Sequence, residues 1–211
     1  GNCMHFACLM AGRHAEAAAV PWEDLTGDPD TRATSTEIYR LCLRGLSFSQ
    51  RLLFAEARSC YQEASLVAAR DRGPNSSLNA IPTVLLAHQA YELDRIDEAE
   101  GMLRGRLDAI NASGFLDCEL RAYVLLTRIA WRNDDLRLAH ELLDQGERIA
   151  GSEGWPRMQA GLLAERLRLF VDAGDLTSAA GCLARLETLV DAGRGSAEPA
   201  DAHVRGYRQL A

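Results

Sequence analysis

An alanine that follows a short polar turn recurs along the chain at intervals of 42, 40 and 40 residues. The four alanines are Ala57, Ala99, Ala139 and Ala179. The residues three positions before them are Phe54, Ile96, Leu136 and Leu176, and those four positions after are Tyr61, Leu103, Leu143 and Leu183. This i, i+3, i+7 spacing is typical of an amphipathic helix, and a small residue in the stripe lets a neighbouring helix approach closely. The pattern predicts four similar helices after four similar turns.

A second apolar helix precedes each turn, and a glycine stands near the end of each helix that follows it. The preceding helices are expected at about residues 36–50, 81–93, 120–132 and 159–173, and the glycines are Gly73, Gly114, Gly154 and Gly193. Glycine stops a helix because it readily takes a positive φ. The chain is therefore predicted to be all-α, a solenoid of helix-turn-helix repeats of about 40 residues, at about 34–73, 77–114, 115–154 and 155–193.

The two ends of the chain are expected to extend this single domain, 1–211. Residues 11–17 repeat the turn pattern, and Ala17 precedes Ala57 by 40 positions, which indicates a partial repeat over 1–30 that ends in a polar loop. A short helix is expected at about 200–210. Solenoids cover their end faces with polar caps, and neither end here has one. We therefore expect a fragment of a longer protein.

Composition narrows the function classes. The 211 residues are 47% hydrophobic, which suffices for a core, and carry a net charge of −7 with no basic block, so direct contact with nucleic acid is not expected. No run of about 18 apolar residues could span a membrane. All 23 basic residues are arginine, which excludes a Schiff-base lysine and a P-loop within these residues. We expect no enzyme activity and no cofactor in this segment.

The cysteines and histidines indicate structural roles. Cys3, Cys8, Cys42, Cys60, Cys118 and Cys182 form no C-x-x-C pair and mostly fall in apolar helical patterns, which favours a reduced, cytoplasmic protein. The stretch from Cys3 through His5 to Cys8 resembles a metal cluster, but on a helix Cys3 points away from the other two and a fourth ligand is missing. No metal site is predicted. His14, His140 and His203 fall at surface-like helical positions.

The repeat resembles the tetratricopeptide type, lengthened from about 34 to about 40 residues. The recurring alanine matches the small residue that opens the second helix of that repeat. Gly45 and Ala87 match the small residue twelve positions earlier, whereas Thr127 and Leu167 depart from it.

Residues 36–189 together resemble the sensor domain of MalT-like, LuxR-family transcriptional activators. The residues that carry the resemblance are Tyr91-Glu92 before Asp97-Glu98-Ala99, Arg128 in "LTRIA", Gly154-Trp155-Pro156-Arg157 and Ala164-Glu165-Arg166. The resemblance implies a bacterial regulator in which an ATP-binding domain precedes the sensor and a DNA-binding domain follows it, so ATP is implied only for a flanking domain. It also implies that an inducer, either a small molecule or a regulatory protein or peptide, binds the concave face.

The concave face of such an array is lined by the first helix of each repeat, and counting back from the alanines selects eight candidates there. They are His88, Tyr91, Glu92, Arg128, Trp131, Arg132, Arg168 and Asp172. Arginines beside aromatic rings suit an anionic or sugar-like ligand or a peptide. Three alternatives stay open: these residues form a solvated face with an inter-repeat core, the chain is a stand-alone protein-interaction scaffold, or its end repeats form a homo-oligomer.

Overall fold

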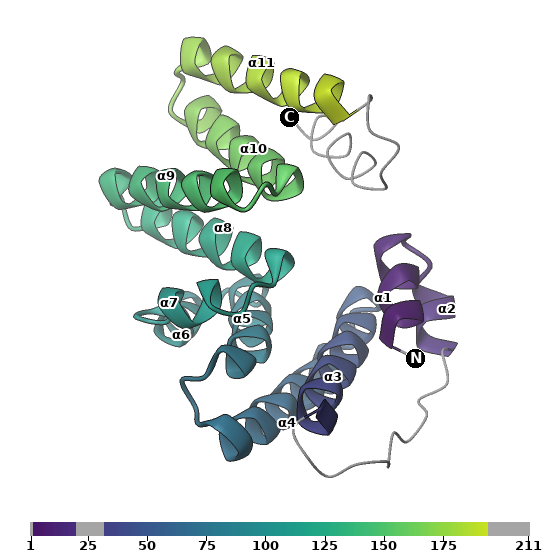
Figure 1. The fold of residues 1–211 in the computed structure, drawn as a ribbon. Helices are drawn as coiled ribbons and strands as arrows, with labels where there is room; N and C mark the ends of the chain where they lie inside the picture. The colour runs from purple at the N-terminus through teal and green to yellow at the C-terminus, as the bar shows by residue number, and fades with distance from the viewer. Residues whose placement is uncertain (1, 20–31, 194–211) are drawn as a thin grey trace. The chain divides into compact units, whose positions relative to one another are not determined.

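The computed structural model describes residues 2–19 and 32–193, and their regular structure is entirely α-helical (Figure 1). The predicted all-α class is confirmed. The described helices belong to two compact units, residues 1–118 and 119–211, with α8 running from one into the other. The prediction that both belong to a single repeat domain stays a prediction. The polar loop within 1–30 and the helix expected at 200–210 lie outside the described residues.

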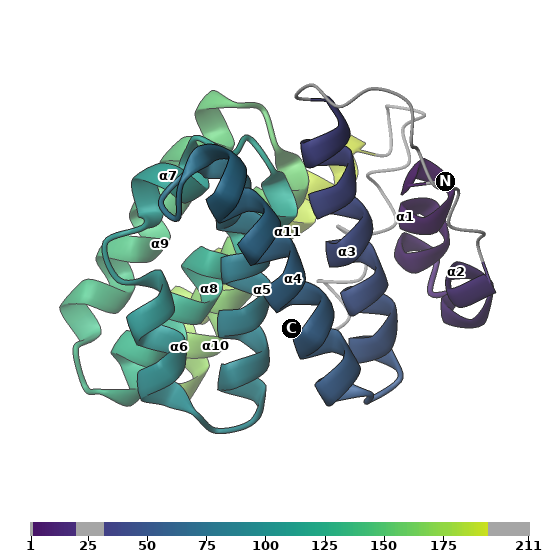
Figure 2. The ribbon, with the colours of Figure 1, turned by 90° about the horizontal axis from the view of Figure 1, so that it is seen from below.

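Helices that follow one another in the chain pack side by side. The first unit holds α1 (Asn2–Met10), α2 (His14–Ala19), α3 (Arg32–Gln50), α4 (Phe54–Arg72), α5 (Ser77–Glu92), α6 (Ile96–Leu103) and α7 (Leu107–Asn111). The second holds α8 (Leu116–Arg132), α9 (Leu136–Ser152), α10 (Pro156–Asp172) and α11 (Leu176–Gly193). Both views show α3 and α4 as neighbours joined by a short turn (Figures 1 and 2). In the second unit α10 contacts both α9 and α11.

One turn geometry recurs before the helices that carry the alanines. The second residue after the preceding helix has a positive φ at Gly12 (70°), Leu52 (61°), Asp94 (58°), Asp134 (60°) and Gly174 (75°). At the third of the predicted turns, the Asp134 N–H donates to Trp131 O at 3.1 Å and the Asp135 N–H donates to Ala130 O at 2.9 Å. These two bonds satisfy helix-end carbonyls in the manner of a Schellman motif. The Asp135 side chain then accepts a hydrogen bond from the Leu138 N–H and caps the next helix.

Small residues lie where the helices touch. Ala17, Ala57, Ala99 and Ala139 are fully buried and Ala179 is 5% exposed. Gly45 on α3 approaches the buried Tyr61 ring of α4 so closely that an added Cβ would stand 2.3 Å from Cε1. In the second unit, a Cβ on Gly146 of α9 would stand 2.9 Å from Leu162 of α10. The helices of each pair therefore pack through close backbone approach.

The helix that begins at Ile96 departs from the prediction of one continuous helix up to Gly114. It breaks after Leu103, passes through Gly105 with a φ of 70°, and resumes as α7. Gly101 and Gly105 lower the helix propensity of this stretch. The Arg106 guanidinium donates to Pro74 O at 3.0 Å and fixes the chain just after the break.

Candidate functional site

The eight predicted site residues lie on three first helices of the helix pairs. His88, Tyr91 and Glu92 are on α5 in the first unit, where His88 Nε2 lies 3.7 Å from Glu92 Oε1. The other five belong to α8 and α10 in the second unit. There the structure brings two predicted arginines together around a carboxylate that the sequence did not select, which makes this the candidate site with the most defined geometry.

Glu165 on α10 joins the two arginines. Its side chain is only 4% exposed, whereas those of Arg128 and Arg168 are 37% and 38% exposed. Arg128 of α8 donates from Nε at 3.1 Å and from Nη2 at 2.8 Å. Arg168 donates from Nε at 2.9 Å and from Nη2 at 2.6 Å, and its Nη1 donates to Asp172 at 2.6 Å. The two guanidinium groups are thus fixed by a shared buried partner and still reach solvent.

The electrostatics of this Glu165 cluster, defined as Arg128, Glu165, Arg168 and Asp172, are balanced. Burial raises the pKa of Glu165, but hydrogen bonds from Arg128 and Arg168 and their positive charge outweigh that effect and hold the pKa below its ordinary value. The two arginines and two acids carry no net charge. An anion would therefore meet ordered donors rather than an excess of positive charge.

Aromatic rings continue the same region onto α9. The Trp131 ring of α8 meets His140 edge-on at 6.4 Å between centroids, and His140 lies 5.6 Å from Phe170 of α10. His140, expected at a surface-like helical position, is half-buried and lies beside these two rings. Trp131 therefore holds neighbouring helices together, as the packing alternative for this residue requires. Arg132, which follows Trp131 and lies one helical turn after Arg128, is exposed.

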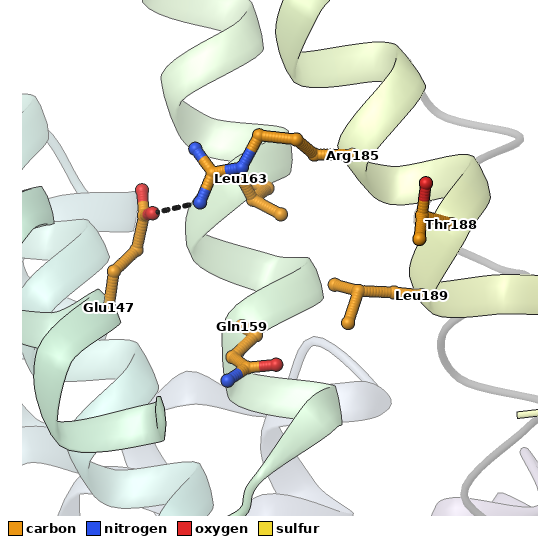
Figure 3. A pocket seen from close by; sticks show the side chains of 6 residues that line it. All are labelled: Glu147, Gln159, Leu163, Arg185, Thr188 and Leu189. Atoms are coloured by element: carbon orange, nitrogen blue, oxygen red, sulfur yellow. Dashed lines mark hydrogen bonds and ion pairs between the residues drawn. The ribbon is translucent and has the colours of Figure 1, made fainter. Parts of the chain in front are cut away.

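A second set of charged residues lies between α9, α10 and α11. Arg166 is 11% exposed and donates to Asp144 at 2.6 Å and to Glu147 at 2.7 Å. Arg185 of α11 donates to the other oxygen of Glu147 at 2.7 Å. Beside this ion pair is a pocket of about 280 Å³ lined by Glu147, Gln159, Leu163, Arg185, Thr188 and Leu189 (Figure 3). None of these lining residues was predicted from the sequence as part of a site.

One acid of the second unit is buried without a hydrogen bond. Glu119 on α8 is 1% exposed, and neither of its carboxylate oxygens has a hydrogen-bond partner among the described residues. Burial, with a smaller contribution from the negative charge of Glu153, raises the pKa of Glu119 to about 7. Its charge therefore changes near neutral pH.

The described residues contain no group of three or more His, Cys, Asp or Glu side chains placed to hold a metal ion. His5 is instead buried and hydrogen-bonded to Ser47 of α3. Cys8, Cys42, Cys60, Cys118 and Cys182 are buried thiols. Within the described ranges, no helix is long and apolar enough to cross a membrane.

Comparison of the chain with protein families, curated proteins and solved structures finds no match.

Proposed function

We propose that this chain is the sensing domain of a larger bacterial regulator and binds an inducer with an anionic group. In this proposal the helix pairs form a tetratricopeptide-like superhelix whose first helices line a concave face. The turn that recurs at Leu52, Asp94, Asp134 and Gly174, each followed five residues later by a buried alanine, supports a common repeat unit. The resemblance to LuxR-family activators supports flanking ATPase and DNA-binding domains.

The observation that carries the binding proposal is the Glu165 cluster. Glu165 orders Arg128 and Arg168 before any ligand arrives, so less side-chain entropy is lost when an anion binds. Arginine is suited to this role because its planar group presents several donors to one carboxylate or phosphate. Arg132 adds an exposed positive charge one helical turn from Arg128.

A sensor also needs a response. Arg128 and Arg168 belong to successive first helices, α8 and α10, so an anion bound to both would favour one spacing of these helices. A ligand shifts such an equilibrium only as far as it binds one state better than the other. In the regulator, that shift would control the flanking domains.

The binding test uses citrate as a small polyanion and hexaglutamate as an acidic peptide, titrated calorimetrically at low salt. Arg132→Glu should weaken binding about tenfold or more. The matched control is Arg137→Glu, which makes the same charge change at an exposed arginine of α9 that pairs with Glu141. Equal weakening in both variants, or binding unchanged in both, would refute a site at the Glu165 cluster. The probe that binds more tightly distinguishes a small inducer from a peptide.

The regulator proposal has a separate test. Antibody raised against this chain should detect, in source cells, a protein several times heavier than its 23.1 kDa. A band near that mass would instead support the stand-alone interaction scaffold, and capture of a protein partner would then be the next experiment.

A further inference from the structure

The pocket beside Glu147 lies on the far side of α10 from the Glu165 cluster. Gln159 and Leu163 line the pocket, whereas Glu165 accepts hydrogen bonds from Arg128 of α8 and from Arg168 on its own helix. Leu163 and Glu165 are two positions apart, and on a helix this spacing places their side chains on nearly opposite sides. The pocket and the Glu165 cluster therefore share no residue, and the pocket is argued separately from the proposed function.

The floor of the pocket is apolar and firmly packed. Leu163 is 2% exposed and belongs to a core cluster with Cys182, Leu186 and Val190. Leu189 of α11 packs against that cluster and forms part of the wall. The close-up shows Leu163 and Leu189 at the pocket, with Gln159 at one end and the Arg185 side chain crossing above Leu163 (Figure 3). An apolar group of a ligand would meet these two leucines.

The mouth of the pocket carries one negative charge, on Glu147, and one positive charge, on Arg185. A ligand with both charges could replace the ion pair between these two side chains. Glu147 binds Arg166 through Oε1 and Arg185 through Oε2, both at 2.7 Å. Arg166 is sheltered at 11% exposed, whereas Arg185 is 59% exposed. Because an exposed ion pair contributes little, Arg185 can turn away at small cost, while Glu147 keeps its bond to Arg166.

We propose that this pocket binds a small zwitterion with an apolar side group, of the class of the aliphatic amino acids. Its carboxylate would pair with Arg185, its ammonium group with Glu147 Oε2, and its side group would cover Leu163 and Leu189. Asp144, Glu147, Arg166 and Arg185 sum to zero charge, so a zwitterion keeps the balance that a singly charged ligand would disturb. A volume of about 280 Å³ lies just below the usual range for pockets that hold drug-sized ligands, which suits a smaller molecule of this kind.

The test uses three probes that share one branched apolar group: L-leucine, 4-methylpentanoate without the ammonium group, and 3-methylbutylamine without the carboxylate. Nitrogen–proton correlation spectra of the full chain should show that millimolar L-leucine shifts the signals of Thr188, Leu189, the Arg185 side chain and the Gln159 amide. The two singly charged probes should bind about tenfold more weakly or worse. If either singly charged probe binds as tightly as L-leucine, the zwitterion assignment is overturned.

Two variants locate the site. Arg185→Gln should abolish the L-leucine shifts without changing the melting temperature, because the side chain is exposed. Arg137→Gln, on α9 but outside the pocket, should leave them unchanged. No shifts with wild type, or shifts that persist in Arg185→Gln, would refute the site. The citrate and hexaglutamate titrations report on the Glu165 cluster, so a failure of the pocket proposal can be distinguished from a failure of the anion-binding proposal.

Discussion

Replacing Glu165 with glutamine removes the one negative charge that Arg128 and Arg168 share. The change keeps the size of the side chain and part of its hydrogen bonding, so its effect reports mainly on charge. Both arginines donate to the same oxygen, Oε1, from Nε of Arg128 at 3.1 Å and Nη2 of Arg168 at 2.6 Å. Without the carboxylate charge, the two guanidinium groups would repel one another.

The size of the effect follows from burial. Breaking a fully buried ion pair by removing one partner costs about 3–5 kcal/mol. Here the acid is buried, but the arginines are 37% and 38% exposed and can be rehydrated, which lowers the cost. We expect Glu165→Gln to reduce the free energy of unfolding by about 2 kcal/mol at pH 7. Glu141→Gln, which disrupts an exposed pair with Arg137 on α9, should cost less than about 0.5 kcal/mol.

Urea denaturation of a double-mutant cycle is the assay. Arg128→Gln alone should destabilise the protein by about 1 kcal/mol, because Glu165 loses one of two partners. In the Glu165→Gln background the same change should be neutral or stabilising, because it removes a repulsive charge. Two results would refute the claim that Arg128 and Arg168 depend on the Glu165 carboxylate. One is that Arg128→Gln lowers the free energy of unfolding equally in both backgrounds. The other is that Glu165→Gln and Glu141→Gln lower it by the same amount.

The pH dependence of the same variant provides an independent check. The pKa of Glu165 in the folded protein is below its ordinary value of 4.5. Its contribution to stability is therefore present above about pH 4.5 and is lost as the pH falls through the folded pKa. The difference in stability between wild type and Glu165→Gln should narrow in acid. A difference that stays constant from pH 7 to pH 3 would contradict this.

Three further predictions concern packing, backbone strain and buried charge. Gly45→Ala should cost about 2–3 kcal/mol in urea denaturation, because the new Cβ would stand 2.3 Å from the Tyr61 ring. Gly101→Ala, whose Cβ meets nothing within 4 Å, should instead stabilise by about 0.5–1 kcal/mol, and equal effects would refute the close approach. Leu52→Gly should stabilise the protein by about 0.5–1 kcal/mol and raise its melting temperature, because Leu52 has a φ of 61° and is 73% exposed. A lower melting temperature would contradict this. The raised pKa of Glu119, about 7 against an ordinary 4.5, means that the contribution of Glu119 to stability is greatest below about pH 4.5 and declines by about 3 kcal/mol as the pH rises from 4.5 to 7. Glu119→Gln should remove this fall, and a fall that persists in the variant would show that another group causes it.

The helices and their turns could be predicted from the sequence because they depend on local spacing. Second helices of the pairs begin at Ile96, Leu136 and Leu176, the residues from which the apolar stripe was counted. The break after Leu103 was missed because the apolar stripe continues through it, and only the two glycines signal that the helix is weak there.

The site was predicted only in part, because partners on different helices depend on how those helices are rotated. Arg128 and Arg168 were selected, but their common partner Glu165 is 37 residues from Arg128. The local signal for it was its position three residues before Arg168 on the same helix. The ring contacts of His140 were missed for the same reason, since its two aromatic neighbours belong to other helices. The pocket at Glu147 has no sequence signal, because three helices contribute to it.

The cations that join the helices of the second unit are all arginines. The interhelical ion pairs are therefore expected to respond to acid but not to alkali. A guanidinium group stays protonated throughout the range in which proteins are folded, whereas a lysine would lose its charge near pH 10. Alkaline buffers should therefore leave the interhelical bonds of these arginines intact, and acid should release the bonds of Arg128 and Arg168 by protonating Glu165. The sequence also contains no side-chain amine, so cross-linkers that join lysines would fail to capture a partner bound to this chain. A search for that partner needs reagents directed at carboxylates or guanidinium groups.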